Sequence, residues 1–209
     1  MKQPDTAHAN GRPWLAKLKS EVFPILAMLL LLTVARSSFA NHYYVPSGSM
    51  EHSLMPGDRV VVDMAAYGLR APFTNRDVVA RDKPKAGDVV VFDSPVDGTR
   101  LIKRVVAIGG DTVDLLDGRL MINGVTLQSR DEPDVEVMAG HRALLNLDAG
   151  GGPDIRGLVI PADQVLVLGD HRGESADGRY FGLVPEREFY GRAVAVYWRR
   201  GEGPVWKRL

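Results

Sequence analysis

The chain has 209 residues, with 26 basic and 26 acidic side chains. This length suggests one catalytic-sized domain with additions, and the absence of a basic excess argues against a nucleic-acid-binding protein. Because there is no cysteine, a disulfide scaffold, a thiol nucleophile and a cysteine-ligated zinc site are excluded.

The first predicted element is an uncharged apolar segment, Val22–Ala35. It is shorter than the about 20 residues that a transmembrane helix needs. One interpretation is a cleaved secretory signal, because Lys17 and Lys19 precede the segment and small residues near Ala40 resemble a cleavage site. The other is a membrane anchor that continues to Val45. Periodicity and length leave both open.

The orientation of such an anchor follows from charge. The residues before the apolar segment carry more basic than acidic side chains, which favours a cytoplasmic N-terminus by the positive-inside rule. We therefore expect a cytoplasmic tail over 1–21, a transmembrane anchor over 22–45 and an extracytoplasmic domain over 46–209.

Beyond the anchor, short β-type runs alternate with turns that contain Gly, Asp or Pro. Such runs, bounded by turn residues, are typical of strands. Strands are predicted over Arg59–Val62, Val89–Phe92, Arg100–Ile108, Val165–Leu168 and Ala193–Trp198.

Two tight hairpins are predicted next to one another. Asp117-Gly118 and Asn123-Gly124 suit the positive φ angles of two-residue turns, and Val113–Leu116 and Leu120–Ile122 flank them. The stretch from about 111 to 163 is expected to form a smaller β subdomain, and most of 68–84 is expected to be a loop. The predicted fold class is mainly β, with an antiparallel β core behind one N-terminal transmembrane helix.

The first segment that suggests chemistry is Pro46–Met50, directly after the apolar segment. A serine on such a Ser/Gly turn is exposed and has free backbone N–H groups around it, so it can supply a nucleophile together with oxyanion donors. The alternative is a plain linker.

A serine nucleophile needs a base. Lys103 is one candidate, because strand alternation puts it on the face of Leu101 and Val105, toward the core, with Arg104 facing outward. Burial would lower the pKa of its amine and make it usable as a base, whereas a solvated strand lysine would stay charged. Imidazole bases remain open as well: His42, His52, His141 and His171.

A polar loop, Gly169–Tyr180, follows a predicted apolar strand. Ser175 could hydrogen-bond the lysine amine, and Asp177 and Arg179 could pair with each other or with the backbone to hold the loop. The alternative is a solvated turn. No pair of histidines has the spacing of metal ligands, so no metal site is expected.

Taken in this order, these segments resemble the type I signal peptidases, membrane-anchored serine endopeptidases with a Ser/Lys dyad. The resemblance extends from about Leu29 to Tyr197. Four boxes in order behind one apolar segment are specific, and they favour the anchor over the cleaved signal. The boxes are Pro46-Ser47-Gly48-Ser49-Met50, Gly87-Asp88-Val89-Val90-Val91-Phe92, Ile102-Lys103-Arg104-Val105-Val106 with Gly109-Gly110-Asp111, and Gly169-Asp170-x-Arg172…Ser175-x-Asp177-x-Arg179.

The resemblance implies roles for individual residues. Ser49 would be the nucleophile and Lys103 the general base, with the Ser47 hydroxyl and the Ser49 N–H as the oxyanion hole. Ser175 would orient Lys103. The same resemblance implies loop support by Asp177 and Arg179 and a substrate-binding wall of Val45, Met50, Leu54 and Ile102. It implies no cofactor and no metal.

Two boxes depart from the family pattern. His52-Ser53-Leu54 stands where the family usually has Pro-Thr-Leu, and His171-Arg172-Gly173-Glu174-Ser175 stands where it usually has Asn-Arg-Asp-Asn-Ser. Gly178 also replaces a common serine. These changes leave the dyad in place and bear on loop rigidity and substrate preference.

The predicted function is a membrane-bound endopeptidase that removes signal peptides after Ala-x-Ala sites at the outer face of a bacterial inner membrane. Its expected partners are preproteins, the lipid bilayer and the protein export machinery, and no nucleic acid. Two alternatives stay open: a specialised peptidase with few clients, and a catalytically silent anchored binding module. A self-cleaving repressor with a related Ser/Lys design would need a helix-turn-helix where this chain has its apolar segment.

Overall fold

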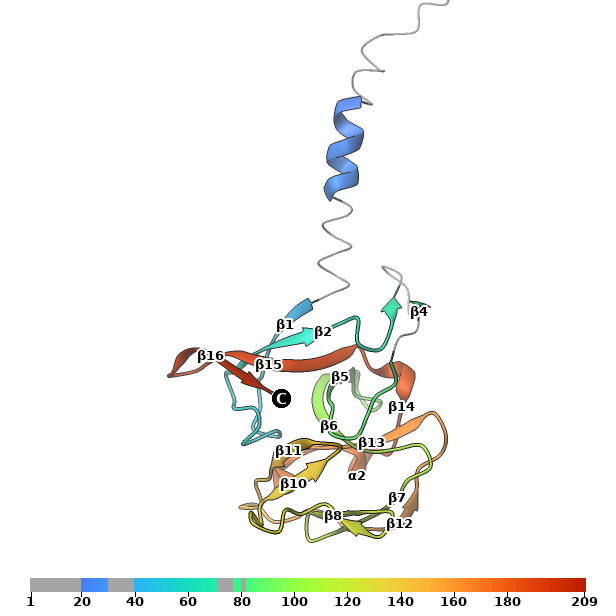
Figure 1. The fold of residues 1–209 in the computed structure, drawn as a ribbon, viewed down its shortest axis with the longest axis vertical. Coiled ribbons are helices and arrows are strands. Elements are labelled where there is room, and N and C mark those ends of the chain that lie inside the picture. Colours follow the sequence, from blue (N-terminus) through green and yellow to red (C-terminus); the bar gives the residue numbers. More distant parts are fainter. Residues whose placement is uncertain (1–19, 30–39, 71–76, 80–81) are drawn as a thin grey trace, which may run out of the picture. The chain divides into compact units, whose positions relative to one another are not determined.

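The computed structural model describes residues 20–29, 40–70, 77–79 and 82–209. Residues 20–29 form a helix within a unit, Met1–Ser37, that is separate from the unit Ser38–Leu209 (Figure 1). In the part of the chain described, no helix has both the length and the apolar character to cross a bilayer. Most of the predicted cytoplasmic tail and residues 30–39 of the predicted anchor lie outside the described residues.

The C-terminal boundary of the predicted anchor is corrected by the first strand. Strand β1, Ala40–Tyr44, pairs antiparallel with β2, Arg59–Asp63. The backbone N–H and C=O groups of residues 40–44 are therefore used in a sheet ladder and not in a membrane helix. The apolar character at Tyr43 and Val45 reflects packing against the domain core.

The larger sheet of the described residues has eight strands, all paired antiparallel (Figure 1). Their order is β1-β2-β15-β5-β6-β13-β14, and β16 pairs with β15. The remaining bounds in this sheet are β5 Val89–Asp93, β6 Arg100–Ile108, β13 Gln164–Leu168, β14 Val184–Pro185, β15 Gly191–Arg199 and β16 Gly203–Arg208. The strands predicted from sequence are confirmed.

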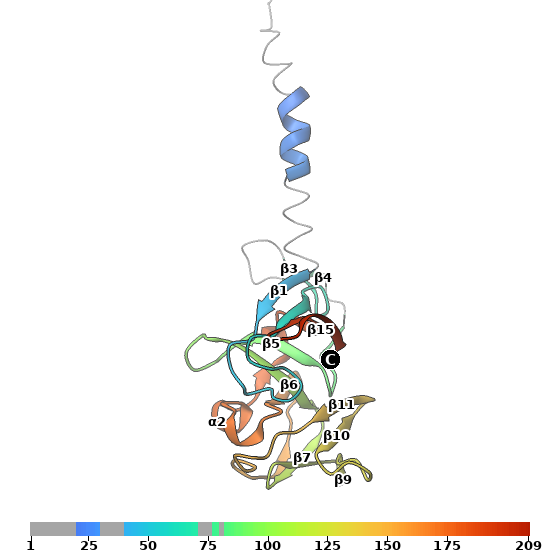
Figure 2. The ribbon, with the colours of Figure 1, turned by 90° about the vertical axis from the view of Figure 1, so that its left-hand side faces the viewer.

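A smaller four-stranded sheet, ordered β12-β7-β8-β9, and a β10–β11 hairpin lie between residues 112 and 159 (Figures 1 and 2). Their bounds are β7 Thr112–Leu116, β8 Arg119–Ile122, β9 Val125–Thr126, β10 Val135–Met138, β11 His141–Leu144 and β12 Ile155–Val159. The turns at Asp117-Gly118 and Asn123-Gly124 have positive φ angles at both residues, as the hairpin prediction required.

The stretch 68–84, predicted as a loop, contains a short ladder. Strand β3, Leu69–Arg70, pairs with β4, Asp77–Val79. Strands this short carry too little alternation to be recognised from sequence. The short helical elements of the domain are η1 Arg172–Glu174, α2 Gly178–Phe181 and η2 Glu186–Glu188.

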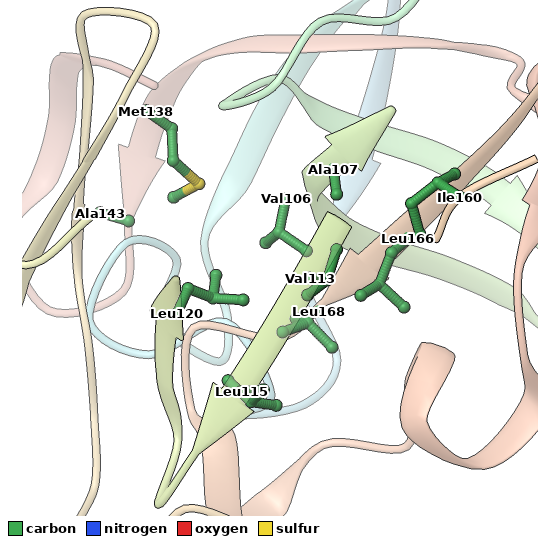
Figure 3. Close-up of a cluster of buried hydrophobic side chains, with 10 residues drawn as sticks. All are labelled: Val106, Ala107, Val113, Leu115, Leu120, Met138, Ala143, Ile160, Leu166 and Leu168. Atoms are coloured by element: carbon green, nitrogen blue, oxygen red, sulfur yellow. The ribbon is translucent and has the colours of Figure 1, made fainter. Parts of the chain in front are cut away.

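The two sheets share one buried apolar cluster. Figure 3 shows Val106 of β6 and Leu168 of β13, from the larger sheet, gathered with Val113 and Leu115 of β7 and Leu120 of β8, from the smaller one. Burying these side chains together removes apolar surface from water, which is the main favourable contribution to folding. The cluster therefore fixes the smaller sheet against β6 and β13.

A second cluster fixes the segment that carries the predicted nucleophile. Met50, directly after Ser49, and Leu54 are buried with Val60 and Val62 of β2 and Val91 of β5. The alternative of a plain linker is therefore wrong, because the segment is a packed turn whose apolar side chains lie in the core.

Strand β6 is covered on both faces, because its neighbours contribute to all three apolar clusters. Lys103 and Arg104 are consecutive and each is only 2% exposed. The prediction that Lys103 faces the interior is confirmed. The prediction that Arg104 faces outward is wrong, because single-face alternation does not hold for a strand buried on both sides.

Candidate active site

The turn Pro46–Met50 is held at both ends by the backbone. The Val45 N–H donates to the Asp58 carbonyl at 2.9 Å, and the Gly57 N–H donates to the Val45 carbonyl at 2.8 Å. The Glu51 N–H closes the turn onto the Gly48 carbonyl at 2.9 Å. Ser49 therefore sits on a segment with little freedom, as an attacking group requires.

The side chains of Ser49 and Lys103 are in contact in the folded domain. The Lys103 Nζ atom lies 2.6 Å from Ser49 Oγ, across 54 positions of sequence. The Ser47 hydroxyl donates to Ser49 Oγ at 3.4 Å. A hydroxyl in contact with a buried amine has a partner that can remove its proton.

Burial lowers the pKa of Lys103 from its usual value of 10.5 to about 8. The carboxylates of Asp177 and Asp170 act in the opposite direction, and the Arg179 guanidinium lowers the pKa further. With a pKa of about 8, about one lysine in ten is neutral at pH 7, against about one in 2,500 for an unperturbed lysine. The environment thus makes Lys103 usable as a base near neutral pH.

Arg104, the neighbour of Lys103, is buried with a complete set of partners. Its Nε and Nη2 atoms donate to the two carboxylate oxygens of Asp170 at 2.9 and 2.8 Å. Its remaining donors reach the Gly87 carbonyl at 2.8 Å and Ser53 Oγ at 3.1 Å. This bidentate ion pair ties β6 to the loop that follows β13.

The predicted pairing of Asp177 with Arg179 is present. Arg179 Nε and Nη2 donate to the two Asp177 oxygens, each at 2.8 Å, and the Gly169 N–H donates to Asp177 at 2.9 Å. Arg179 also donates to the carbonyls of Gly151 and Arg172, at 2.6 and 2.5 Å. The pair therefore holds the loop as the sequence suggested.

Ser175 does not make the predicted hydrogen bond to Lys103. Its hydroxyl is buried and has no hydrogen-bond partner among the described residues. A side chain at Gly169 would collide with both Ser175 Oγ and the Ser49 carbonyl, so Ser175 packs beside the nucleophile's main chain. The amine of Lys103 instead contacts Ser49.

A groove of about 850 Å³ opens over the Ser49–Lys103 pair. Val45, Met50 and Ile102 line it, as the wall prediction requires, but Leu54 does not line it and lies in the core. Beside the groove, residues 100–103 of β6 pair with β5 only, because the pairing of β6 with β13 begins at Arg104. This half of β6 has a free backbone edge within the described sheet.

None of the candidate histidines is hydrogen-bonded to Ser49 Oγ in the described part of the chain. His42 packs against Tyr197, with ring centroids 5.1 Å apart. The His171 ring is bonded to Asp148. His52 is exposed, and His141 packs beside Gly87. Within the same residues, no three His, Cys, Asp or Glu side chains are grouped to hold a metal ion.

Sequence reasoning missed several residues that surround the site. Asp170 was noted only as part of a box, although it neutralises Arg104. Arg172 is buried and donates to Glu136 at 2.5 Å, and Asp148 and Glu51 both face His171. A Gly-Asp pair at a strand end could have indicated Asp170. Glu136 lies in β10 and Asp148 in a turn after β11, and neither position carries a local sequence signal.

Comparison with known proteins gives one consistent result. Residues 18–198 match the family described as signal peptidase, peptidase S26. The chain is 33% identical to signal peptidase I of Pseudomonas aeruginosa and 31% identical to that of Pseudomonas fluorescens, in each case over 93% of this chain and 78% of the relative. A crystal structure of a signal peptidase I from Enterococcus faecalis is 31% identical and covers 54% of this chain and 98% of its own, with a TM-score of 0.38.

Proposed function

The chain belongs to the signal peptidase family, peptidase S26, whose members are serine endopeptidases, and we propose that Ser49 and Lys103 are its catalytic dyad. The observation that carries the proposal is the 2.6 Å separation of Ser49 Oγ and the amine of Lys103, a residue that is only 2% exposed. A lysine of lowered pKa can replace the histidine of other serine proteases as general base.

In the proposed reaction, neutral Lys103 accepts the Ser49 hydroxyl proton while Ser49 Oγ attacks the scissile carbonyl carbon. The resulting ammonium returns the proton to the leaving amine as the C–N bond breaks, which leaves an acyl-enzyme. Lys103 then activates a water molecule that hydrolyses the ester and restores Ser49.

The negative oxygen formed during attack needs hydrogen-bond donors. Two groups beside Ser49 Oγ are suited to this role. The backbone N–H of Ser49 donates to none of the described residues, and the Ser47 hydroxyl lies 3.4 Å from Ser49 Oγ. We propose that a carbonyl oxygen placed in the groove accepts hydrogen bonds from this N–H and from the Ser47 hydroxyl, which can rotate toward it.

The proposed substrate lies extended in the groove along the free edge of β6. Its backbone can pair with residues 100–103, as strand addition to a sheet edge does. Val45, Met50 and Ile102 form apolar walls, and Leu54 supports Met50 from the core. Small side chains such as alanine at alternate positions fit these walls, which supports an Ala-x-Ala preference.

We also propose that the N-terminal apolar segment, ending before β1, anchors the enzyme in the inner membrane with its catalytic domain outside. Preproteins delivered by the export machinery carry a signal peptide in the same bilayer. Confinement of enzyme and substrate to one surface raises their effective concentration.

The test is cleavage of a purified preprotein with an Ala-x-Ala site by the detergent-solubilised full chain. Wild type should cut after the second alanine, and Ser49→Ala and Lys103→Ala should stay folded and inactive. A folded but silent wild type would favour a peptidase with few clients or a binding module. If Lys103→Ala cuts at the wild-type rate, the dyad is refuted and the histidines become the candidate bases.

A further inference from the structure

We propose that His171 is a positioning residue that holds the nucleophile turn, here residues 46–54, in place, acting together with Asp148 and Glu51. The proposal rests on the proposed role of Ser49 as nucleophile. His171 stands at a position where this chain departs from the family pattern.

The first contact is made by the main chain. The His171 N–H donates to the Ser49 carbonyl at 3.2 Å. Two residues earlier, the absence of a side chain at Gly169 allows the loop to approach the same carbonyl closely. The position of the Ser49 peptide therefore depends on where residues 169–171 are held.

The second contact is made by the ring. His171 is 4% exposed, and its Nε2 atom lies 2.7 Å from Asp148 Oδ1. On the other side, Nδ1 lies 3.6 Å from Glu51 Oε2 and has no hydrogen-bond partner among the described residues. Glu51 belongs to the nucleophile turn, and its carboxylate lies against Gly48. The imidazole is thus placed between the turn and Asp148.

The segment that presents Asp148 is itself fixed to the loop of His171. The Asn146 N–H donates to the Asp170 carbonyl at 2.9 Å, and the Arg172 N–H donates to the Asn146 carbonyl at 3.1 Å. Burial acts to raise the pKa of Asp148, but hydrogen bonds with the His171 ring and with the Asn146 side chain hold it below its usual range. Asp148 is therefore a carboxylate at neutral pH and accepts the ring N–H.

These contacts connect the region of the smaller sheet to the reacting hydroxyl. Asp148 holds the ring, the ring faces Glu51 of the turn, and the His171 main chain holds the Ser49 carbonyl. A displacement of about 1 Å at a reacting group can reduce a rate about 100-fold. His171 is placed to prevent such a displacement of Ser49 without touching substrate.

The experiment compares His171→Gln, which keeps hydrogen-bonding groups, with His171→Phe, which only fills space, in the full-length enzyme with the same preprotein. We expect kcat to fall about 10- to 100-fold for His171→Phe with KM nearly unchanged, and clearly less for His171→Gln. Asp148→Asn should reduce kcat, and its effect should not add to that of His171→Phe. The controls are His141→Gln, on strand β11, and Asp131→Asn, an exposed carboxylate between β9 and β10; both should keep wild-type kcat.

A second readout does not depend on peptidase activity. Hydrogen exchange of the Glu51 and Leu54 amides, which bond within the turn, should be faster in His171→Phe and near wild type in His171→Gln. Unchanged exchange in His171→Phe, or a Phe variant as active as the Gln variant, would overturn the positioning role. If the wild type cuts no preprotein but hydrogen exchange responds as expected, the proposed function is refuted, whereas the role of His171 in holding the turn is supported.

Discussion

The lowered pKa of Lys103 predicts the pH dependence of catalysis. A general base must be neutral, so kcat/KM should rise with pH and reach half its maximum near the pKa of about 8. At that pKa, about a tenth of the lysine is neutral at pH 7 and about nine tenths at pH 9. The two fractions are about 1/11 and about 10/11, so the rate should increase about tenfold between these two pH values.

The pH range over which kcat/KM rises, called the rising limb of the profile here, depends mainly on one structural cause. Lys103 is covered on strand β6, and burial lowers its pKa more than the carboxylates of Asp177 and Asp170 raise it. A solvated lysine, with a pKa of about 10.4, would instead give about a tenfold increase for every pH unit through pH 9. The two cases differ clearly in the range where the protein can be assayed.

The assay is the initial rate of cleavage of an Ala-x-Ala peptide by the solubilised enzyme from pH 6 to 10.5, with circular dichroism at each pH. Lys207→Arg is the matched control, because burial also lowers the pKa of Lys207, which donates to the His52 and Ser53 carbonyls at 3.2 Å. The limb should persist in this variant. A flat profile, a midpoint above pH 10, or loss of the limb in Lys207→Arg would refute the assignment to Lys103.

Three further predictions concern the residues that shape the site. Lys103→Met should raise the free energy of unfolding at pH 7 by up to about 3 kcal/mol. The folded protein disfavours a charged lysine, since it lowers the pKa of Lys103 from 10.5 to about 8, and each pKa unit corresponds to about 1.36 kcal/mol that the methionine variant does not lose. The wild type should recover this difference as the pH rises from 8 to 10.5, so urea denaturation at pH 7 and at pH 10.5 checks the sign, and an equal difference at both would contradict it. Asp170→Asn should cost about 3–5 kcal/mol in the same measurement, since it leaves Arg104 charged and buried without its partner. Gly169→Ala should lower kcat about 100-fold in a folded protein, because the new methyl group collides with Ser175 and displaces the nucleophile turn; wild-type kcat would show that the loop can move aside.

The parts of the fold that could be predicted from sequence are those with local signals. Asp117-Gly118 and Asn123-Gly124 specify their turns through backbone conformation, which neighbours cannot easily change. The alternation around Lys103 also gave the correct side of β6. For these elements the decisive interactions lie within a few residues of one another.

The residues that were misplaced depend on partners far away in sequence. Arg104 was predicted to face outward because the carboxylate that pairs with it in the interior, Asp170, lies 66 positions later in the chain. Ser175 was expected to reach Lys103, yet the close approach at Gly169 places it beside the Ser49 carbonyl instead. The 40–44 segment was assigned to the anchor because Tyr43 and Tyr44 suit a membrane interface as well as a strand, and the pairing partner, β2, lies far enough along the chain to leave no local signal.

The low pKa of Lys103 also depends on what its neighbouring carboxylates are bonded to. Asp170 and Asp177 are both close enough to raise the pKa of Lys103, yet neither forms an ion pair with its amine among the described residues. Each is bound by two donors of an arginine, Asp170 by Arg104 and Asp177 by Arg179, at 2.8–2.9 Å. Because the arginines satisfy these charges, the carboxylates offset only part of the desolvation that disfavours a charged lysine. In the proposed mechanism the two arginines touch no substrate, and they favour the neutral lysine by binding the carboxylates that would otherwise stabilise its charged form.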